Sequence, residues 1–259
     1  MKLSIITINL NNITGLQKTF ESIFEQLFPD FEYIVIDGGS TDGSKELIEK
    51  NEEKLSYWLS EKDSGVYHAM NKGIKKATGD YLLFLNSGDY LINKSILQEV
   101  SDKLDGKEII YGDVFLIMSD TKSWTGVYPD KLSFQHFVDG SLPHPGSFIK
   151  RNLFDKVGYF DENIKIVADW KFFLDAICRY NASYKHIDKT ISVFYHDGIS
   201  SISQNQEIMA NEKRSVFLSE YPLFIENSKE LSNLRAFRNN PLISKFVKFA
   251  KSFGLLKDI

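Results

Sequence analysis

The chain has 259 residues, which is long enough for one large domain or two small ones. Its 42% apolar and 25% charged residues are ordinary for a globular protein, and the net charge of −4 gives no basic bias toward nucleic acid. The single cysteine excludes an intramolecular disulfide and leaves any metal site to oxygen and imidazole ligands, and no stretch reaches the roughly 18 apolar residues of a membrane span.

Strand and helix patterns alternate over the first ninety residues. Apolar runs predict strands at 3–10, 31–36, 57–60 and 81–85, and apolar residues at helical spacing predict helices at 13–27, around 47–48 and at 66–77. Thr14 is the expected N-cap of the first helix, and Gly79 is the expected C-cap of the third. This alternation predicts an α/β fold whose mostly parallel sheet has all its strand ends at one edge. Polar residues at the four ends should therefore converge: Asn9, Asp37, Asp63 and the Asn86 to Asp89 turn.

The second half is less regular. We expect a helix around 96–100, a strand at 109–118, a turn at 120–123, a helix at 168–180 and a strand at 190–195. From about residue 204 the pattern becomes helical, which predicts a domain at 1–203 and a helical extension at 204–259. Lysines interleave with apolar residues near the end, so the last helix either lies on an anionic membrane or packs on protein with its lysines in water.

Three polar segments follow strand ends and carry candidate chemistry. Residues 37–44 (DGGSTDGS) lack both the dinucleotide fingerprint and the P-loop, but a carboxylate there can accept hydrogen bonds from a base or a ribose. Residues 61–73 (EKDSGVYHAMNKG) open a helix whose N-terminal amides favour phosphate, with Lys72 as an added charge. Residues 86–89 (NSGD) end in Asp89, which suits Mg²⁺ or Mn²⁺ shared with a diphosphate. The alternative for each segment is an ordinary polar turn.

In series, these segments resemble the family 2 glycosyltransferases with the GT-A fold. The similarity rests on Ile-Ile-Thr in the first strand, IDGGSTDGS at 36–44, DSGVY at 63–67, AMNKG at 69–73 and LNSGD at 85–89. It covers residues 1 to about 200 and is greatest to bacterial exopolysaccharide enzymes such as colanic acid glycosyltransferases. The resemblance implies a nucleotide-sugar site that includes Thr7, Asn9, Asp37, Asp63, Asn71, Lys72, Asn86 and Ser87.

The resemblance also implies a metal site. Asp89 occupies the D-x-D-like position and would hold Mn²⁺ or Mg²⁺, with His196 as a second ligand. Many relatives carry a further acid where this chain has Ser87 or Gly88. We therefore expect a weak metal site that is completed by the diphosphate of the substrate.

A catalytic base is implied on a downstream helix. Asp169 in the segment ADWK matches its position, and an inverting transferase needs a carboxylate to accept the proton of the attacking hydroxyl. The alternative is that Asp169 only favours the start of its helix through the dipole. His144 and Trp170 are expected near the donor or acceptor sugar, although a structural histidine and core packing are the alternatives.

These expectations define a metal-dependent, inverting glycosyltransferase of cell-surface polysaccharide synthesis. It would move a sugar from a nucleotide-sugar, with UDP the expected nucleotide, to a saccharide or lipid-linked acceptor. Its expected location is cytoplasmic, or peripheral on the inner face of the membrane, because MKLSIITIN reads as a strand and not as a signal peptide. The alternatives are a non-catalytic nucleotide-binding subunit of a glycan assembly complex and a sugar nucleotidyltransferase, whose usual Gly-rich N-terminal loop is missing.

Overall fold

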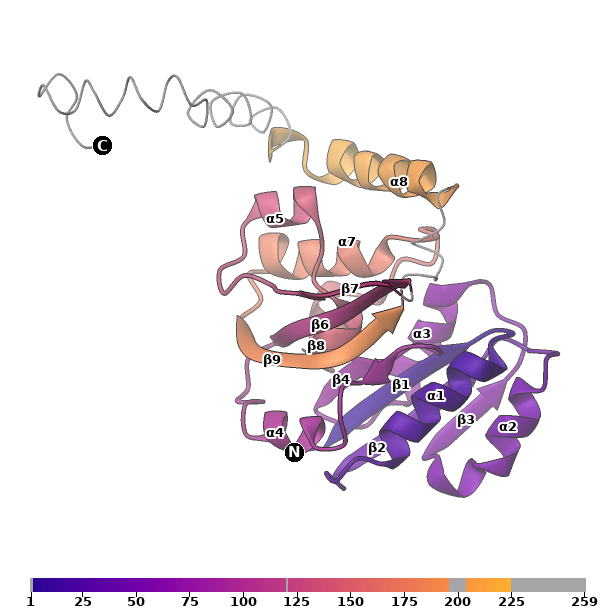
Figure 1. Ribbon diagram of the computed structural model, residues 1–259. Coiled ribbons are helices and arrows are strands. Elements are labelled where there is room, and N and C mark those ends of the chain that lie inside the picture. Colours follow the sequence, from indigo (N-terminus) through magenta and orange to yellow (C-terminus); the bar gives the residue numbers. More distant parts are fainter. Residues whose placement is uncertain (1, 120, 196–203, 225–259) are drawn as a thin grey trace, which may run out of the picture. The chain divides into compact units, whose positions relative to one another are not determined.

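The computed structural model describes residues 2–119, 121–195 and 204–224 (Figure 1). The chain divides into two compact units, Met1–Met209 and Ala210–Ile259. The first unit contains a sheet of nine strands among the described residues. In order across the sheet the strands are β3 (Tyr57–Ser60), β2 (Phe31–Asp37), β1 (Leu3–Asn9), β4 (Tyr81–Phe84), β8 (Ser147–Lys150), β6 (Ile109–Ser119), β9 (Tyr184–Tyr195) and β5 (Tyr90–Leu91), while β7 (Lys122–Gly126) pairs with β6.

The four strands β3, β2, β1 and β4 are parallel, as the alternating pattern predicted. They are connected through α1 (Ile13–Phe24), α2 (Ser44–Lys50) and α3 (Val66–Lys76). Because alternate residues of a strand point to opposite faces, each apolar strand here supplies two cores. The α1 and α2 side chains pack with residues such as Ile5 and Val35, and α3 packs on the other face, where Gly73 lies against Ile6.

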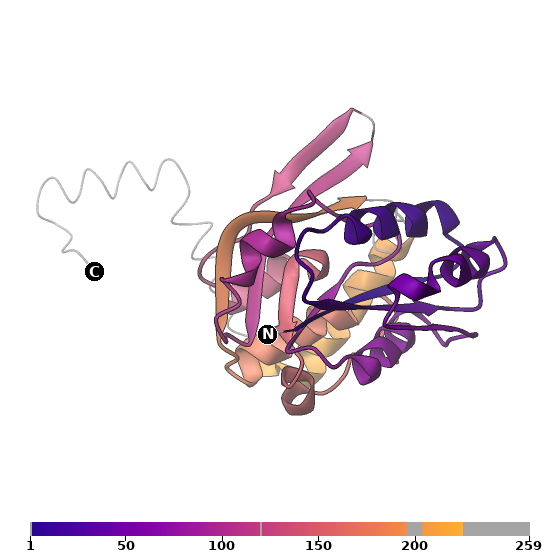
Figure 2. The ribbon, with the colours of Figure 1, turned by 90° about the horizontal axis from the view of Figure 1, so that it is seen from below.

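The other half of the sheet is mixed, and the sequence predicted it less well. Strand β8 runs antiparallel to both β4 and β6, β9 runs parallel to β6, and β5 runs antiparallel to β9. The segments β5 and β8 were not predicted, because two and four residues are too short to show a period. Two further expectations were wrong: β9 begins at Tyr184, and Lys122 and Ser123 belong to β7 and not to a turn. The β6–β7 hairpin extends from the sheet in Figure 2.

Short helices complete the first unit. They are α4 (Ile96–Ser101), α5 (Phe134–Asp139), α6 (Leu153–Val157) and α7 (Ala168–Leu174), with 3₁₀ turns at Glu52–Lys54 and His144–Gly146. After α7 the predicted helix continues as a π-helical turn, Asp175–Arg179.

Two predicted helix caps were wrong. The N-cap of α1 is Asn12, whose side chain accepts a hydrogen bond from the Gly15 amide, and not Thr14. Helix α3 ends at Lys76 with an extended residue after it, so Gly79 is not its C-cap. Instead, a Cβ on Gly79 would come within 2.5 Å of Ser4 Oγ and 2.8 Å of the Lys2 carbonyl oxygen. Glycine is needed there because the backbone passes close to β1.

The predicted helical extension begins with α8 (Asn205–Glu220), which crosses the boundary between the two units. The basic amphipathic helix expected near the end of the chain lies outside the described residues. None of the helices in the described part of the chain is long and apolar enough to cross a membrane.

Candidate active site

Three of the predicted strand ends meet at Asp37. Its carboxylate accepts hydrogen bonds from Asn9 Nδ2 at 2.8 Å, from the Ser60 hydroxyl at 2.7 Å and from the Ser40 amide at 2.9 Å. Burial raises the pKa of Asp37, but these donors outweigh it and hold the pKa below its usual value. A Cβ on Gly38 would lie 2.7 Å from Asp63 Oδ2, so the Asp63 carboxylate is at the same edge.

Three other residues expected to contact the nucleotide are engaged within the protein. The fully buried Thr7 hydroxyl donates to the Leu85 carbonyl oxygen at 2.7 Å. The buried Asn71 amide bonds the main chain of Phe160 in both directions. Lys72 Nζ lies 2.7 Å from a carboxylate oxygen of Glu61. In this structure, therefore, Thr7 and Asn71 make structural hydrogen bonds that stabilise the strands and loops around the site.

The turn from Asn86 to Asp89 is held by α1. Thr19 is the central contact: its hydroxyl donates to the Asp89 carbonyl oxygen at 2.7 Å and accepts from the Gly88 amide at 3.1 Å. Asn12 Nδ2 donates to the Ser87 carbonyl oxygen at 3.1 Å. Gly88 has a φ of 107°, a conformation that favours glycine. These bonds fix the backbone that presents the buried Asp89 side chain.

His144 joins this turn to Asp169. Its Nδ1 lies 3.3 Å from Asp169 Oδ2, and its Nε2 lies 3.2 Å from Asn86 Nδ2 and 3.9 Å from Asp89 Oδ2. On the other side of Asp169, the Tyr67 hydroxyl lies 2.9 Å from Oδ1 and 2.5 Å from the Ile166 carbonyl oxygen, and its single proton is shared between these two acceptors. Each oxygen of the Asp169 carboxylate therefore has a hydrogen-bond partner. His144 is a neighbour of both the proposed base, Asp169, and the proposed metal ligand, Asp89.

The electrostatics of this cluster favour an ionised Asp169. Burial raises the Asp169 pKa, but the hydrogen bond and charge of His144 and the hydrogen bond from Tyr67 lower it more, and the pKa falls below its usual value. Burial lowers the His144 pKa, yet Asp169 and then Asp89 raise it above its usual value. The Tyr67 pKa lies well above its usual value because of burial and of Asp169. Asp169 is thus a carboxylate able to accept a proton at neutral pH.

Trp170 is buried and does not offer its ring face for stacking on a sugar. Its side chain is 2% exposed, and its indole N–H donates to the Phe137 carbonyl oxygen at 2.7 Å. The structure matches the core-packing alternative for Trp170. His196, the second expected metal ligand, lies outside the described residues.

The Asn86 to Asp89 turn is the candidate site for a divalent metal ion. Within residues 2–119, 121–195 and 204–224, no three His, Cys, Asp or Glu side chains gather closely enough to hold a metal ion. The turn does present the Asp89 carboxylate, and Asn86 Oδ1 is buried with no hydrogen-bond partner among the described residues. Oxygen donors of this kind suit Mg²⁺ or Mn²⁺, so the residues fit a metal held jointly with a diphosphate.

Sequence reasoning missed the role of Tyr67, which lies in the DSGVY segment but reads as a core aromatic. Its ring does pack on Phe160, at 5.6 Å between centroids, while its hydroxyl reaches Asp169. The polar tip of a buried tyrosine usually has a partner, and that general rule was the available signal.

Comparisons with known proteins concern the family and the fold of the chain. The sequence model of the family described as Glycosyl transferase family 2 matches residues 4–162. An uncharacterized glycosyltransferase of Mycobacterium tuberculosis H37Rv is 36% identical over 181 residues, which are 67% of this chain and 68% of the relative. A PGL/p-HBAD biosynthesis glycosyltransferase of Mycobacterium bovis BCG is 34% identical over 176 residues, which are 65% of this chain and 67% of the relative.

A solved structure shares the fold. S. aureus TarS 1–349 in complex with UDP superposes with a TM-score of 0.62 at 23% identity, over 82% of this chain and 65% of that chain. This chain thus spans just under two thirds of the length of its structural neighbour. The same TarS fragment in complex with UDP-GlcNAc gives a TM-score of 0.65 at 22% identity, over 85% of this chain and 68% of that chain.

Proposed function

The chain belongs to glycosyl transferase family 2 and has a GT-A fold, and on this premise we propose that it is an inverting glycosyltransferase that moves one sugar from a nucleotide-sugar to a saccharide or lipid-linked acceptor. The observation that carries the proposal is the Asp169 carboxylate, held by Tyr67 and His144 beside the Asn86 to Asp89 turn. A positioned carboxylate next to a strand-end ligand site is what such a transfer needs.

In the proposed reaction Asp169 accepts the proton of an acceptor hydroxyl. The oxygen forms a bond to the anomeric carbon, while the bond from that carbon to the diphosphate oxygen breaks and the nucleoside diphosphate leaves with the electron pair. Tyr67 and His144 keep the carboxylate oriented for this proton transfer. Mn²⁺ or Mg²⁺, when bound, would neutralise charge on the diphosphate. Asp89 would hold the ion, together with His196 in our proposal.

UDP is the nucleotide we propose for the donor. The Asp63 carboxylate lies at the edge where the strands end, where an acceptor can pair with a base N–H group or a ribose hydroxyl, and the buried Asp37 would hold this edge in place through Asn9, Ser40 and Ser60. Support for UDP also comes from TarS, which is described in complex with UDP and with UDP-GlcNAc. The M. bovis relative is named as a PGL/p-HBAD biosynthesis glycosyltransferase, which supports an acceptor in glycolipid or cell-surface polysaccharide synthesis.

We also propose a peripheral position on the cytoplasmic face of the membrane, through the basic amphipathic residues after about 235. Sedimentation with anionic vesicles tests this proposal. The full chain should sediment with phosphatidylglycerol vesicles, and a chain truncated after residue 235 should remain in the supernatant. Equal sedimentation of the two chains would reject the membrane contact.

Substitution of the two acids tests the enzymatic proposal. Asp169→Asn should keep the UDP-induced rise in melting temperature but lose at least about a hundredfold in sugar transfer or donor hydrolysis, because the amide cannot accept the proton. Asp89→Ala should lose activity and the Mn²⁺-dependent part of UDP binding. Asp155→Asn, an exposed acid on α6, is the matched control and should behave as the wild type.

Three outcomes would contradict this proposal. Normal turnover by Asp169→Asn would place the base elsewhere. Undiminished donor hydrolysis by Asp89→Ala would remove the proposed metal site from the reaction. Release of pyrophosphate from a nucleoside triphosphate and a sugar phosphate would identify a nucleotidyltransferase instead.

A further inference from the structure

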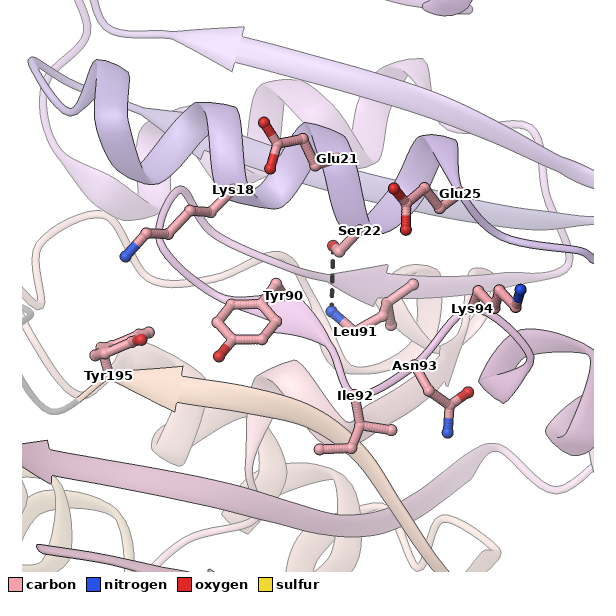
Figure 3. A pocket seen from close by; sticks show the side chains of 10 residues that line it. All are labelled: Lys18, Glu21, Ser22, Glu25, Tyr90, Leu91, Ile92, Asn93, Lys94 and Tyr195. Carbon is pink, nitrogen blue, oxygen red and sulfur yellow. Dashed lines mark hydrogen bonds between the residues drawn. The ribbon is translucent and has the colours of Figure 1, made fainter. Parts of the chain in front are cut away.

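A pocket of ≈420 Å³ lies beside α1, next to the proposed active site but not lined by its acids (Figure 3). This volume is within the roughly 300–1,000 Å³ range of small-molecule sites. The lining residues come from α1, from β5 with the segment after it, and from the end of β9. Neither His144 nor Asp169 is among them, so the pocket is a separate surface of the first unit.

One wall of the pocket is the polar stripe of α1. Its residues are three and four positions apart and therefore share one side of the helix: Lys18, Glu21 and Ser22, with Glu25 at the C-cap. The opposite wall runs from Tyr90 to Lys94. The Ser22 hydroxyl accepts a hydrogen bond from the Leu91 amide at 3.2 Å, which joins the two walls (Figure 3). This hydrogen bond holds the segment after the Asn86 to Asp89 turn against α1.

Two tyrosines from neighbouring strands form the aromatic part of the pocket. The ring centroids of Tyr90 and Tyr195 are 6.1 Å apart with an angle of 44° between the planes. Lys18 Nζ lies 4.9 Å from the centroid of the Tyr195 ring. Burial and the neighbouring Tyr195 raise the pKa of Tyr90 to about 12, so its hydroxyl is a neutral hydrogen-bonding group at physiological pH.

The charge of the lining restricts the class of ligand. Lys18 and Lys94 are balanced by Glu21 and Glu25, so a phosphate or another anion would meet two carboxylates as well as two ammonium groups. A neutral ligand with many hydroxyls can use all four charged groups as hydrogen-bond partners and can lay an apolar ring face on a tyrosine. A saccharide has this combination of properties.

We propose that this pocket is a second saccharide-binding site, which holds a neutral acceptor chain away from the end that reacts. This inference rests on the proposed transferase function, because it assumes that the acceptor is a glycan. Tyr90 follows Asp89 directly in the chain, so the pocket begins one residue from the turn that would hold the diphosphate. A glycan anchored there remains close to the reaction centre between successive encounters with the donor.

The test is binding of neutral tetrasaccharides to the full chain in the presence of saturating UDP. Cellotetraose, chitotetraose, maltotetraose and mannotetraose are titrated and followed by saturation-transfer NMR. At least one of them should bind, Tyr195→Ala should weaken that binding at least tenfold, and Lys18→Ala should weaken it severalfold. Lys45→Ala, an exposed lysine on α2, is the control and should bind as the wild type. Lys18→Ala should keep the wild-type thermal shift with UDP.

Several results would overturn the inference. They are no binding of any tetrasaccharide at millimolar concentration, binding that Tyr195→Ala leaves unchanged, and binding that is measured without UDP but is lost when UDP is added to saturation. Failure of the transferase proposal would look different, because the wild type would then show no thermal shift with UDP or UDP-GlcNAc while Tyr195-dependent tetrasaccharide binding remained measurable.

Discussion

Replacement of Glu32 by glutamine should destabilise the parallel half of the sheet. Glu32 lies on β2, is 5% exposed and is surrounded by donors from two other segments. Its Oε1 accepts from the Ser4 hydroxyl at 2.6 Å and the Gly79 amide at 3.0 Å, and its Oε2 accepts from the Thr78 hydroxyl at 2.7 Å and Lys2 Nζ at 3.0 Å. This carboxylate therefore joins β1, β2 and the α3–β4 connection.

The magnitude follows from the pKa of Glu32. Burial raises it, but the hydrogen bonds from Ser4, Thr78 and Lys2 lower it from 4.5 to about 2. A difference of about 2.5 pKa units corresponds to roughly 3.4 kcal/mol between the ionised and protonated forms. Lys2 is half-exposed, so solvent screens its share, and we expect a loss of about 2–3 kcal/mol for Glu32→Gln at pH 7. The glutamine also turns an amide NH₂ toward either Lys2 Nζ or the Gly79 amide, which can only donate.

Urea unfolding followed by circular dichroism measures this effect. The Glu32 carboxylate stabilises the fold fully above about pH 5, and this contribution is lost as the pH falls from about 4.5 toward 2. The wild type should therefore converge on Glu32→Gln between pH 5 and pH 2. Glu53→Gln, an exposed glutamate, should change the free energy of unfolding by less than about 0.5 kcal/mol. An equally small change for Glu32→Gln at pH 7, or a gap that stays constant with pH, would refute the reasoning.

Three further predictions concern the site and its frame. Tyr67→Phe removes a donor from Asp169 Oδ1 but keeps the ring, so the Asp169 pKa should rise and the acid limb of the pH–rate profile of sugar transfer should move to higher pH; an unmoved limb would count against the assigned base. Gly79→Ala should cost about 1–3 kcal/mol in urea unfolding because its Cβ meets the Lys2 carbonyl oxygen, whereas Gly140→Ala, whose Cβ has no neighbour nearer than 3.6 Å, should cost under about 1 kcal/mol. Asp37→Asn should weaken UDP binding about tenfold in calorimetry, because the Asn9, Ser60 and Ser40 donors lose their charged acceptor. Unchanged affinity for UDP would show that nucleotide binding does not require the Asp37 carboxylate.

The parallel half of the sheet could be predicted because its sequence patterns extend over only a few consecutive residues. Each strand from β1 to β4 is an apolar run bounded by turn residues, and the helices between them show their own period. The register that pairs Asn9 with Asp37 follows from parallel strands of similar length. In contrast, β5 and β8 are too short to show a pattern, and they form strands only because the long strands β9 and β6 lie beside them.

The acids of the proposed site were identified from sequence, but their partners were not. Asp169, Asp89 and His144 were all named as candidates, yet the contact of His144 with both acids joins residues 25 and 55 positions apart, and Tyr67 reaches Asp169 across 102 positions. Thr7, Asn71 and Trp170 matched the expected pattern equally well, and their polar groups bond inside the protein instead. Residue type is thus insufficient to separate a ligand contact from a structural hydrogen bond.

The amino-acid sequence by itself determined the α/β order, the parallel core strands, the edge where polar residues gather and the residue types that the chemistry needs. The tertiary structure alone decided which of those residues share hydrogen bonds, that Glu32 joins three segments, and that Tyr90 and Tyr195 meet in the pocket beside α1. The physical reason is that periodicity and turn preferences act over a few residues. The partner of a buried polar group, in contrast, depends on which distant strands become neighbours and in which register.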